Sequence, residues 1–131
     1  MAVMTKEEFV QHVKSDTLPM YRLAYSILQN SADAEDAVSE AIVHAYEKLD
    51  TLKKADSFRN WILQIAANEA KKIYRQNKRT SPVEWEENLS PEFYDEHHEL
   101  WDAVMQLDGG YRDVIVLFYY ERCTIPEISR I

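Results

Sequence analysis

The sequence has little of what would build a turn-rich, disulfide-bonded or membrane-spanning protein. It has two glycines and four prolines in 131 residues, and this scarcity argues against an all-β fold and favours long helices. Its single cysteine, Cys123, excludes an intrachain disulfide and a zinc site rich in thiolates. The longest apolar run, residues 114–120, is far shorter than the roughly 20 residues that cross a bilayer. We therefore expect no membrane insertion and, without a signal segment at the start, a cytoplasmic protein.

Lysine is absent from residues 81–131, and charge is spread very unevenly along the chain. The whole sequence has 15 Lys and Arg against 23 Asp and Glu, a net charge of −8. Residues 53–79 nevertheless hold eight cations and two acids, whereas residues 81–99 hold seven acids and no Lys or Arg. A basic block before an acidic one indicates two different surfaces or partners, or else a solvated basic helix end beside an acidic linker. The negative total therefore does not exclude nucleic acid as a partner.

Helix start signals divide the first part of the chain into four segments. The first begins at a capping box of Thr5 and Glu8, and a second begins around Pro19. The third begins at residues 30–31 and carries a stripe of alanines, and the fourth follows a break in the pattern at residues 49–56. Four such segments predict a compact helical bundle.

The second part of the chain predicts a linker and an incomplete helix-turn-helix domain. The linker, at 80–91, has two prolines and no helical period, and the helix that follows should end at Gly109 and Gly110. A further helix then starts with an apolar set that includes Tyr111 and Phe118, and a second capping box at 124–127 has only four residues after it. We thus expect an all-α protein with a helical domain at 1–79, an acidic linker at 80–91 and a truncated domain at 92–131.

The sequence gives little support for a catalytic site or a metal site. His12 and His44 each follow a glutamate by four residues, which is typical of surface pairs, and no metal-ligand pattern such as H-E-x-x-H occurs. A glycine-rich phosphate-binding loop is excluded, because the sequence has only two glycines. Cys123 precedes a helix start but has no base nearby in sequence, so we expect an ordinary turn residue. The sequence predicts no enzyme, no metal site and no cofactor, and a metal-dependent helical enzyme is the least favoured hypothesis.

The basic segment 58–79 suits nucleic-acid binding. Its apolar residues face a core, while its cations and Asn68 recur at spacings of three, four and seven on the remaining surface. Cations there would bind phosphates, an asparagine could read a base edge, and an exposed aromatic could stack on an unpaired base. Phe58 and Trp61 both match the buried stripe, so the core is the simpler assignment for each.

An ordered set of motifs resembles a bacterial family. The set comprises DAEDAV at 33–38, SFRNWILQIAAN at 57–68 with its basic continuation, YRDVIVL at 111–117 and the final capping box. Over nearly all of 20–79 and 100–131 the chain resembles the second region and the start of the fourth region of bacterial sigma factors of the extracytoplasmic-function (ECF) type. The resemblance implies a non-catalytic subunit that directs RNA polymerase to promoters.

The resemblance also implies which residues meet each partner. The 33–38 helix would dock on the coiled coil of the polymerase clamp through Asp33, Asp36, Ser39 and Glu40, although these acids also complement the helix dipole. The loop 50–57 and the next helix would recognise the minus-ten element and hold its non-template strand, with a base flipped into a pocket. The DNA-binding residues implied are Lys53, Lys54, Arg59, Asn60, Trp61, Asn68, Lys71, Lys72, Arg75, Lys78 and Arg79. The acidic linker would thread the polymerase interior or serve as a tether, and an anti-sigma factor would be a further partner.

Three departures from the family pattern stand out. His44 and Tyr46 occupy positions where the family often has arginine and tryptophan, and Cys123 stands where the turn commonly has a glycine. From the resemblance we also expect the recognition helix for the minus-thirty-five element to be missing from residues 1–131.

The alternative function is that of a helical protein-interaction module, for example a sigma-like regulator that binds polymerase without promoter recognition. Joint exposure of Asn68, Lys71 and Arg75 beside an open 50–57 loop would favour promoter binding. Burial of Asn68, or acids that neutralise this face, would favour the interaction module.

Overall fold

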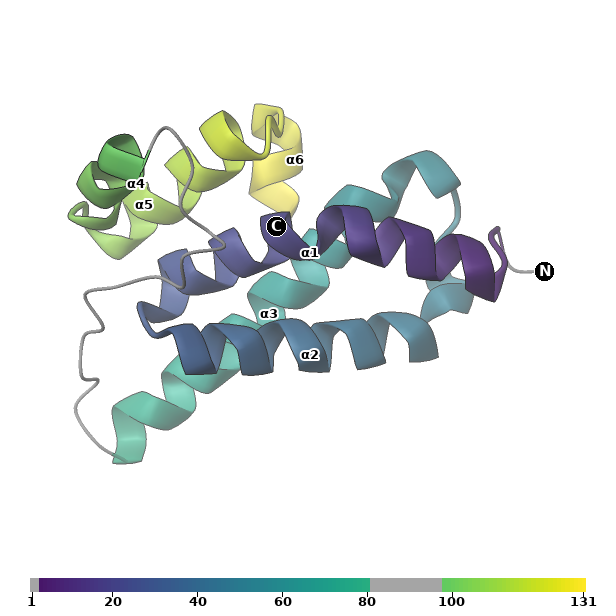
Figure 1. The fold of residues 1–131 in the computed structure, drawn as a ribbon, viewed down its shortest axis with the longest axis horizontal. Helices are drawn as coiled ribbons and strands as arrows, with labels where there is room; N and C mark the ends of the chain where they lie inside the picture. Colours follow the sequence, from purple (N-terminus) through teal and green to yellow (C-terminus); the bar gives the residue numbers. More distant parts are fainter. Residues whose placement is uncertain (1–2, 81–97) are drawn as a thin grey trace.

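The computed structural model describes residues 3–80 and 98–131, and every regular element in these ranges is helical. The elements are α1 (Lys6–Leu28), α2 (Ser31–Glu47), the 3-10 turns η1 (Leu49–Thr51) and η2 (Ala55–Ser57), α3 (Phe58–Thr80), α4 (His98–Met105), α5 (Gly109–Ile115), the π-helix η4 (Val116–Tyr120) and α6 (Ile125–Arg130). The predicted all-α class is confirmed, and the apolar run 114–120 is helical as expected. In Figure 1, α1 lies between α2 and the later helices α4 to α6.

The first helix is continuous, so the predicted restart at Pro19 is wrong. The capping box is present, because the Thr5 hydroxyl accepts from the Glu8 N–H and the Glu8 carboxylate accepts from the Thr5 N–H. Pro19 lies inside α1 and is buried, and the Thr17 hydroxyl donates to the Val13 carbonyl at 2.6 Å. An interior proline costs about 3 kcal/mol, which the burial of α1 on both sides of this position offsets. Three helices, not four, therefore form the bundle before residue 80.

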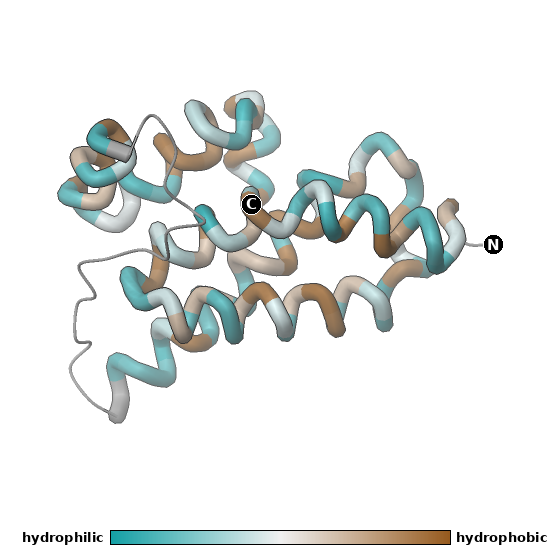
Figure 2. The backbone as a smooth tube through the Cα atoms, in the orientation of Figure 1, coloured by the Kyte–Doolittle hydropathy of each residue, from teal (hydrophilic) through white to brown (hydrophobic). Residues whose placement is uncertain are grey.

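Small side chains bring α2 and α3 close to each other and to α1. Asn30 caps α2 by accepting from the Asp33 N–H at 2.9 Å. The buried alanines of α2 and α3 are Ala34, Ala37, Ala41, Ala45, Ala66, Ala67 and Ala70. Larger side chains, including Met20, Leu23, Phe58, Ile62 and Leu63, fill the remaining space. Figure 2 shows the resulting alternation of hydrophobic and hydrophilic positions along the helices.

The later helices pack on α1 and share its hydrophobic core. Trp101 of α4 is buried, and its ring lies 6.3 Å from that of Tyr25 on α1. The Ser26 hydroxyl donates to Asp113 at 2.8 Å, and the Arg112 guanidinium donates to the Ser26 carbonyl. Hydrogen bonds and apolar contacts therefore both hold the elements from α4 through η4 against α1.

One expectation about the start of α5 is wrong. Gly109 and Gly110 form its first turn after Asp108 as N-cap, instead of ending the preceding helix, and neither glycine has a positive φ. Tyr111 of α5 and Phe118 of η4 are 72% and 56% exposed, whereas Arg112 is buried. The Arg112 guanidinium also donates to the Leu107 carbonyl, so a cation lies on the buried side of α5.

The turn before α6 is built around a left-handed residue. Arg122 has a φ of 57°, a conformation that favours glycine, whereas Cys123 is buried at 4% exposure. The residue in this turn whose backbone conformation suits glycine is thus Arg122, next to Cys123. Thr124 and Glu127 form the predicted capping box at the start of α6.

Replacement of Ala41 by leucine should destabilise the bundle. Ala41 is fully buried on α2, where the closely packed helices leave no room for three more carbon atoms. We expect a loss of about 1–3 kcal/mol in the free energy of unfolding, measured by urea denaturation. Ala32 is exposed on the same helix, so Ala32→Leu is the matched control and should change little. Equal stability of the two variants would contradict the close packing.

Candidate nucleic-acid interface

The second half of α3 presents most of the predicted DNA-binding side chains to solvent. Asn68, Lys71, Lys72, Arg75 and Lys78 are exposed. Their spacings of three, four and seven place them along one side of the helix. Lys78 also lies 5.6 Å from the centre of the Tyr74 ring, which is 41% exposed. The side chain of Arg79 lies outside the described part of the structure. Figure 2 shows the hydrophilic character of this end of α3.

The two aromatic residues at the start of α3 differ in burial. Phe58 is 1% exposed and belongs to the core, as the simpler assignment predicted. Trp61 packs against Phe58 with ring centres 5.7 Å apart, but it is only partly buried. Part of the Trp61 ring is therefore accessible beside the exposed side of α3.

The loop that leads into α3 is open except at one anchor. Leu52 is buried at 4% exposure and ties the loop to the core. The remaining residues of 50–57, which include Lys53 and Lys54, are exposed. The Thr51 hydroxyl donates to the Lys48 carbonyl at 2.7 Å. The short 3-10 turns η1 and η2 lie on either side of the two lysines. Both predicted lysines thus stand on a surface loop directly before α3.

The C-terminal segment contacts three of the predicted DNA-binding residues. Arg59 lies 3.7 Å from the Glu121 carboxylate. Asn60 donates from its amide nitrogen to the Glu127 carboxylate, and its amide oxygen accepts from the Cys123 thiol at 3.8 Å. The Lys71 ammonium donates to the Ile131 carbonyl at 3.3 Å. Residues 121–131 therefore contact α3 from Arg59 near its start to Lys71 beyond its middle.

A buried ion pair anchors this segment on α1. The Glu121 side chain is 0% exposed and accepts from Arg22 Nη2 at 2.5 Å and from Nε at 3.2 Å. The same guanidinium lies 5.7 Å from the centre of the Tyr120 ring. A buried carboxylate without a cation would be costly, so Arg22 is what permits Glu121 to sit inside the molecule.

Burial and neighbouring charges tune three titratable groups near this pair. Burial raises the pKa of Asp16 on α1, while the nearby Arg59 lowers it to a smaller extent. Burial also raises the pKa of the Cys123 thiol, and Glu127 adds to this effect, so Cys123 stays a thiol as an ordinary turn residue would. The backbone N–H and then the hydroxyl of Thr124 hold the pKa of Glu127 below its ordinary value, and this carboxylate stays anionic.

The outer side of α2 carries the predicted polymerase-binding residues. Asp36, Ser39 and Glu40 are exposed. Asp33 is only partly exposed, because its carboxylate accepts from the Asn77 amide of α3 at 2.9 Å. Three of the four side chains are thus available to a partner, and Asp33 also joins α2 to α3.

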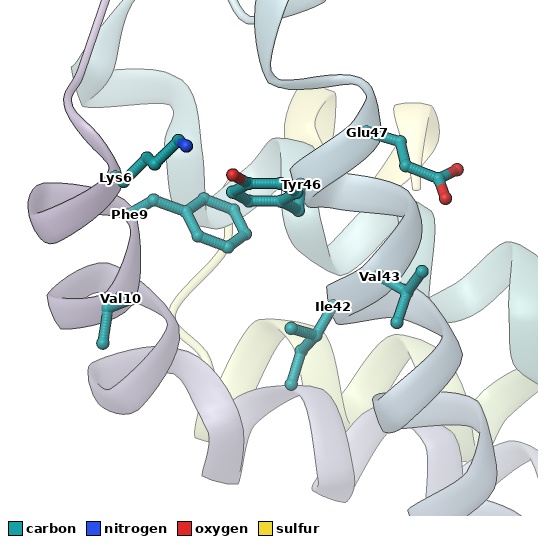
Figure 3. A pocket seen from close by; sticks show the side chains of 7 residues that line it. All are labelled: Lys6, Phe9, Val10, Ile42, Val43, Tyr46 and Glu47. Atoms are coloured by element: carbon teal, nitrogen blue, oxygen red, sulfur yellow. The ribbon is translucent and has the colours of Figure 1, made fainter.

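An apolar hollow of about 460 Å³ opens between the start of α1 and the end of α2. Its lining residues are Lys6, Phe9, Val10, Ile42, Val43, Tyr46 and Glu47, shown in Figure 3. The rings of Phe9 and Tyr46 meet edge to face at 5.6 Å. Val43 and Tyr46 are about half exposed, so α2 has an apolar as well as an acidic outer surface.

The histidines pair differently from the expectation of contacts within one helix. His44 Nδ1 lies 2.5 Å from the Glu69 carboxylate of α3, and the His12 ring packs on Phe58 at 4.9 Å. Glu8 instead serves the capping box. Within residues 3–80 and 98–131, no three His, Cys, Asp or Glu side chains gather as a metal site requires. No helix in the same described ranges is long and apolar enough to cross a membrane.

Two features of the interface escaped the sequence reasoning. Gln64 is exposed four residues after Asn60 and four before Asn68, so helical spacing alone could have placed it on the same side of α3. The Arg22–Glu121 pair joins residues 99 positions apart, and no local pattern signals it.

Comparison with known proteins identifies a family with the same all-α fold. The profile of the Sigma-70 region 2 family matches residues 14–80, which lie in α1, α2, α3 and their connections. RNA polymerase sigma factor SigV of Bacillus subtilis is 28% identical over 131 residues, covering 97% of this chain and 79% of SigV. ECF RNA polymerase sigma factor SigW of the same organism is 28% identical over 131 residues, covering 86% of this chain and 70% of SigW. A probable RNA polymerase sigma factor of Haemophilus influenzae is 38% identical over 79 residues, covering 56% of this chain and 40% of that protein.

These matches confirm the family that the motifs indicated. The matched family and relatives define a non-enzymatic transcription initiation factor. The chain belongs to the Sigma-70 region 2 family and is a sigma factor of the ECF type.

Replacement of Asp16 by asparagine should stabilise the protein at neutral pH. The pKa of Asp16 is raised in the fold, so the folded state disfavours the charged form, and stability falls as the pH rises through the folded-state pKa. A neutral amide at this position would remove that cost, so the melting temperature should exceed that of wild type at pH 7. The gain should shrink as the pH falls towards 3.8, the ordinary pKa of an aspartate.

Thermal unfolding monitored by circular dichroism at pH 7 and at about pH 4 tests this dependence. Asp102→Asn changes an exposed carboxylate and should show no comparable gain. A loss of stability in Asp16→Asn at pH 7 would mean that the charge of Asp16 stabilises the fold.

Proposed function

We propose that the protein binds core RNA polymerase and recognises and melts the minus-ten element of promoters. The observation that carries this proposal is the exposed row of Asn68, Lys71, Lys72 and Arg75 on α3, which follows the open loop 50–57. The family supports a role in transcription initiation, and the row supplies side chains that suit DNA. Such a protein would work in the cytoplasm, where an anti-sigma factor would be a further partner.

The side chains of this row on α3 suit a single DNA strand that is bound along its sugar–phosphate backbone. Lysine and arginine side chains bind phosphates and release counterions, which gives affinity without sequence preference. Amides such as that of Asn68 can bond to a base edge, and the accessible part of Trp61 can stack on an unpaired base. Unstacking one base costs a few kcal/mol, so contacts made only with the open strand would drive melting. Lys53 and Lys54 would hold the backbone next to that strand.

The polymerase would meet the outer side of α2. Asp36 and Glu40 are exposed there one helical turn apart, and Ser39 lies beside them. Two carboxylates on one helix favour a partner surface that carries cations, and the neighbouring apolar Val43 adds contact area that a charged patch lacks. The clamp coiled coil of the polymerase is the partner that the resemblance implies for this side. The assignment of 1–79, 80–91 and 92–131 as domain, linker and second domain stays a prediction.

The alternative is a regulator that binds polymerase without reading DNA. Exposure of Asn68, Lys71 and Arg75 favours promoter binding. The acids Glu121 and Glu127 beside the start of α3 favour the alternative at that end of the helix. Transcription from a promoter library with added core polymerase distinguishes the two functions, because a regulator of this kind would bind the polymerase and start no transcript.

Replacement of Lys71 and Lys72 by alanine should weaken promoter binding by the polymerase complex on all sequences alike. Each lost phosphate contact should lower the slope of log K against log salt by up to about one unit. The measurement is fluorescence anisotropy of labelled promoter DNA at several salt concentrations. Lys6 and Lys14 are exposed on α1, so their double alanine variant is the matched control. An unchanged slope would remove Lys71 and Lys72 from the DNA surface.

Replacement of Asp36 by arginine should weaken binding to core polymerase. It reverses one charge on the outer side of α2 and should leave helix content intact, because Asp36 is exposed. A pull-down titration with core polymerase measures the effect, which should be about tenfold or more for a reversed charge in a contact. Glu35→Arg is the control, since Glu35 is exposed about 100° further round the same helix. Equal binding by both variants would exclude this side of α2.

A further inference from the structure

Tyr74 is an exposed aromatic residue on α3 that the row of DNA-binding side chains described above does not include. It is 41% exposed, and within residues 58–78 it is the one large hydrophobic side chain that is exposed. The other apolar residues of this stretch are buried or partly buried. A single exposed aromatic residue is ordinary by itself, so the neighbours of Tyr74 decide what its ring can bind.

Cations lie close to the Tyr74 ring. The Lys78 ammonium is 5.6 Å from the centre of the ring, which is the distance of a cation–π contact. At about 100° per residue, Lys71 and Lys78 both lie within about 60° of Tyr74 around the helix, one on the turn before it and one on the turn after. Arg75 is the next residue and is also exposed. The ring therefore belongs to the positively charged part of the α3 surface.

An accessible ring among cations has the chemistry that an unpaired nucleotide requires. A base can stack on the ring, because every base has a π face, while the phosphates on either side of it bind the neighbouring cations. The bases of a duplex are paired and stacked on one another, so a duplex would contact the cations alone. An acidic peptide would also be held by charge alone. The exposed ring therefore favours a single strand over both of these ligands.

Tyr74 is far enough from Trp61 to contact a different nucleotide of the same strand. Tyr74 follows Trp61 by 13 residues, which at about 1.5 Å per residue is about 20 Å along α3. A stacked strand advances about 3.4 Å per nucleotide, so about six nucleotides span this distance. The two aromatic residues are also about 140° apart around the helix, so the strand would cross α3 obliquely, past the cations that lie between them.

We propose that Tyr74, together with Lys78, forms a second stacking site for an unpaired DNA base, separate from the one at Trp61. This rests on the proposed function of α3 as a DNA-binding helix. Because a base can reach the ring only from an open strand, Tyr74 adds to the affinity for a single strand and adds nothing to the affinity for a duplex. The site therefore favours the melted state of the promoter over the paired state.

The test replaces Tyr74 by leucine and measures, by fluorescence anisotropy, binding of the full chain to a fluorescein-labelled single strand of mixed sequence, about 16 nucleotides long. Loss of one stacked base should weaken binding about fivefold or more. The slope of log K against log salt should not change, because no charge is removed, and neither should the affinity for the duplex of the same sequence. Tyr74→Phe keeps the ring and should bind as wild type does. Tyr111→Leu changes an exposed tyrosine of α5 and is the matched control, with unchanged binding expected.

Weaker binding of Tyr74→Leu to the single strand, with an unchanged salt slope and an unchanged duplex affinity, supports the stacking site. Wild-type affinity of this variant for the single strand overturns it, and so does an equal loss on strand and duplex, because paired bases cannot stack on the ring. If wild type binds neither strand nor duplex, the DNA-binding function fails and the stacking site with it. If wild type binds, the double variant of Lys71 and Lys72 lowers the salt slope and Tyr74→Leu binds like wild type, the DNA-binding function stands and only the stacking site fails.

Discussion

The ion pair between Arg22 and Glu121 determines how the second part of the chain sits on the first. A carboxylate buried at 0% side-chain exposure is tolerated only beside a cation, because several kcal/mol of hydration are lost on burial. Arg22 offers that cation on the side of α1 that α2 and α3 leave uncovered. Once Glu121 is fixed there, the short turn and α6 must follow, and Glu127 comes to Asn60 on α3. The contacts made by Asn60 on α3 thus depend on an ion pair that contains no residue of α3.

The two surfaces of α1 differ in the kind of contact they make. Towards α2 and α3 the contact is apolar and close, with alanines such as Ala41 and Ala66 fully buried, so opening it would expose hydrophobic surface and leave cavities. Towards α5 and η4 the contact includes Ser26, Arg112 and Glu121, whose polar groups regain water when they separate. The second contact is therefore more polar than the first, although Trp101, Val116 and Leu117 also belong to the buried core there.

Local features of the fold could be predicted from the sequence, and features set by distant contacts could not. The capping boxes at Thr5 and Thr124 depend on atoms three residues apart, so the sequence pattern contains the whole interaction. Pro19 and Gly109 were misinterpreted because tertiary packing overrides the preference of a single residue for a helix end. Helical spacing put the candidate site on one side of α3, but it could not reveal that residues 60 positions further along would cover part of it.

The uneven distribution of charge along the chain has a structural consequence that the net charge of −8 does not reveal. The acid-rich second part supplies Glu121 and Glu127, and both lie at the start of the basic helix. The candidate DNA surface is therefore divided into an exposed group, to which Asn68 and Arg75 belong, and a group engaged by the segment 121–131. Side chains of the exposed group face solvent, whereas the Asn60 amide already makes one hydrogen bond through its nitrogen and one through its oxygen. Two amides on α3 therefore differ in their surroundings, because that of Asn60 is held by Glu127 whereas that of Asn68 is exposed to solvent.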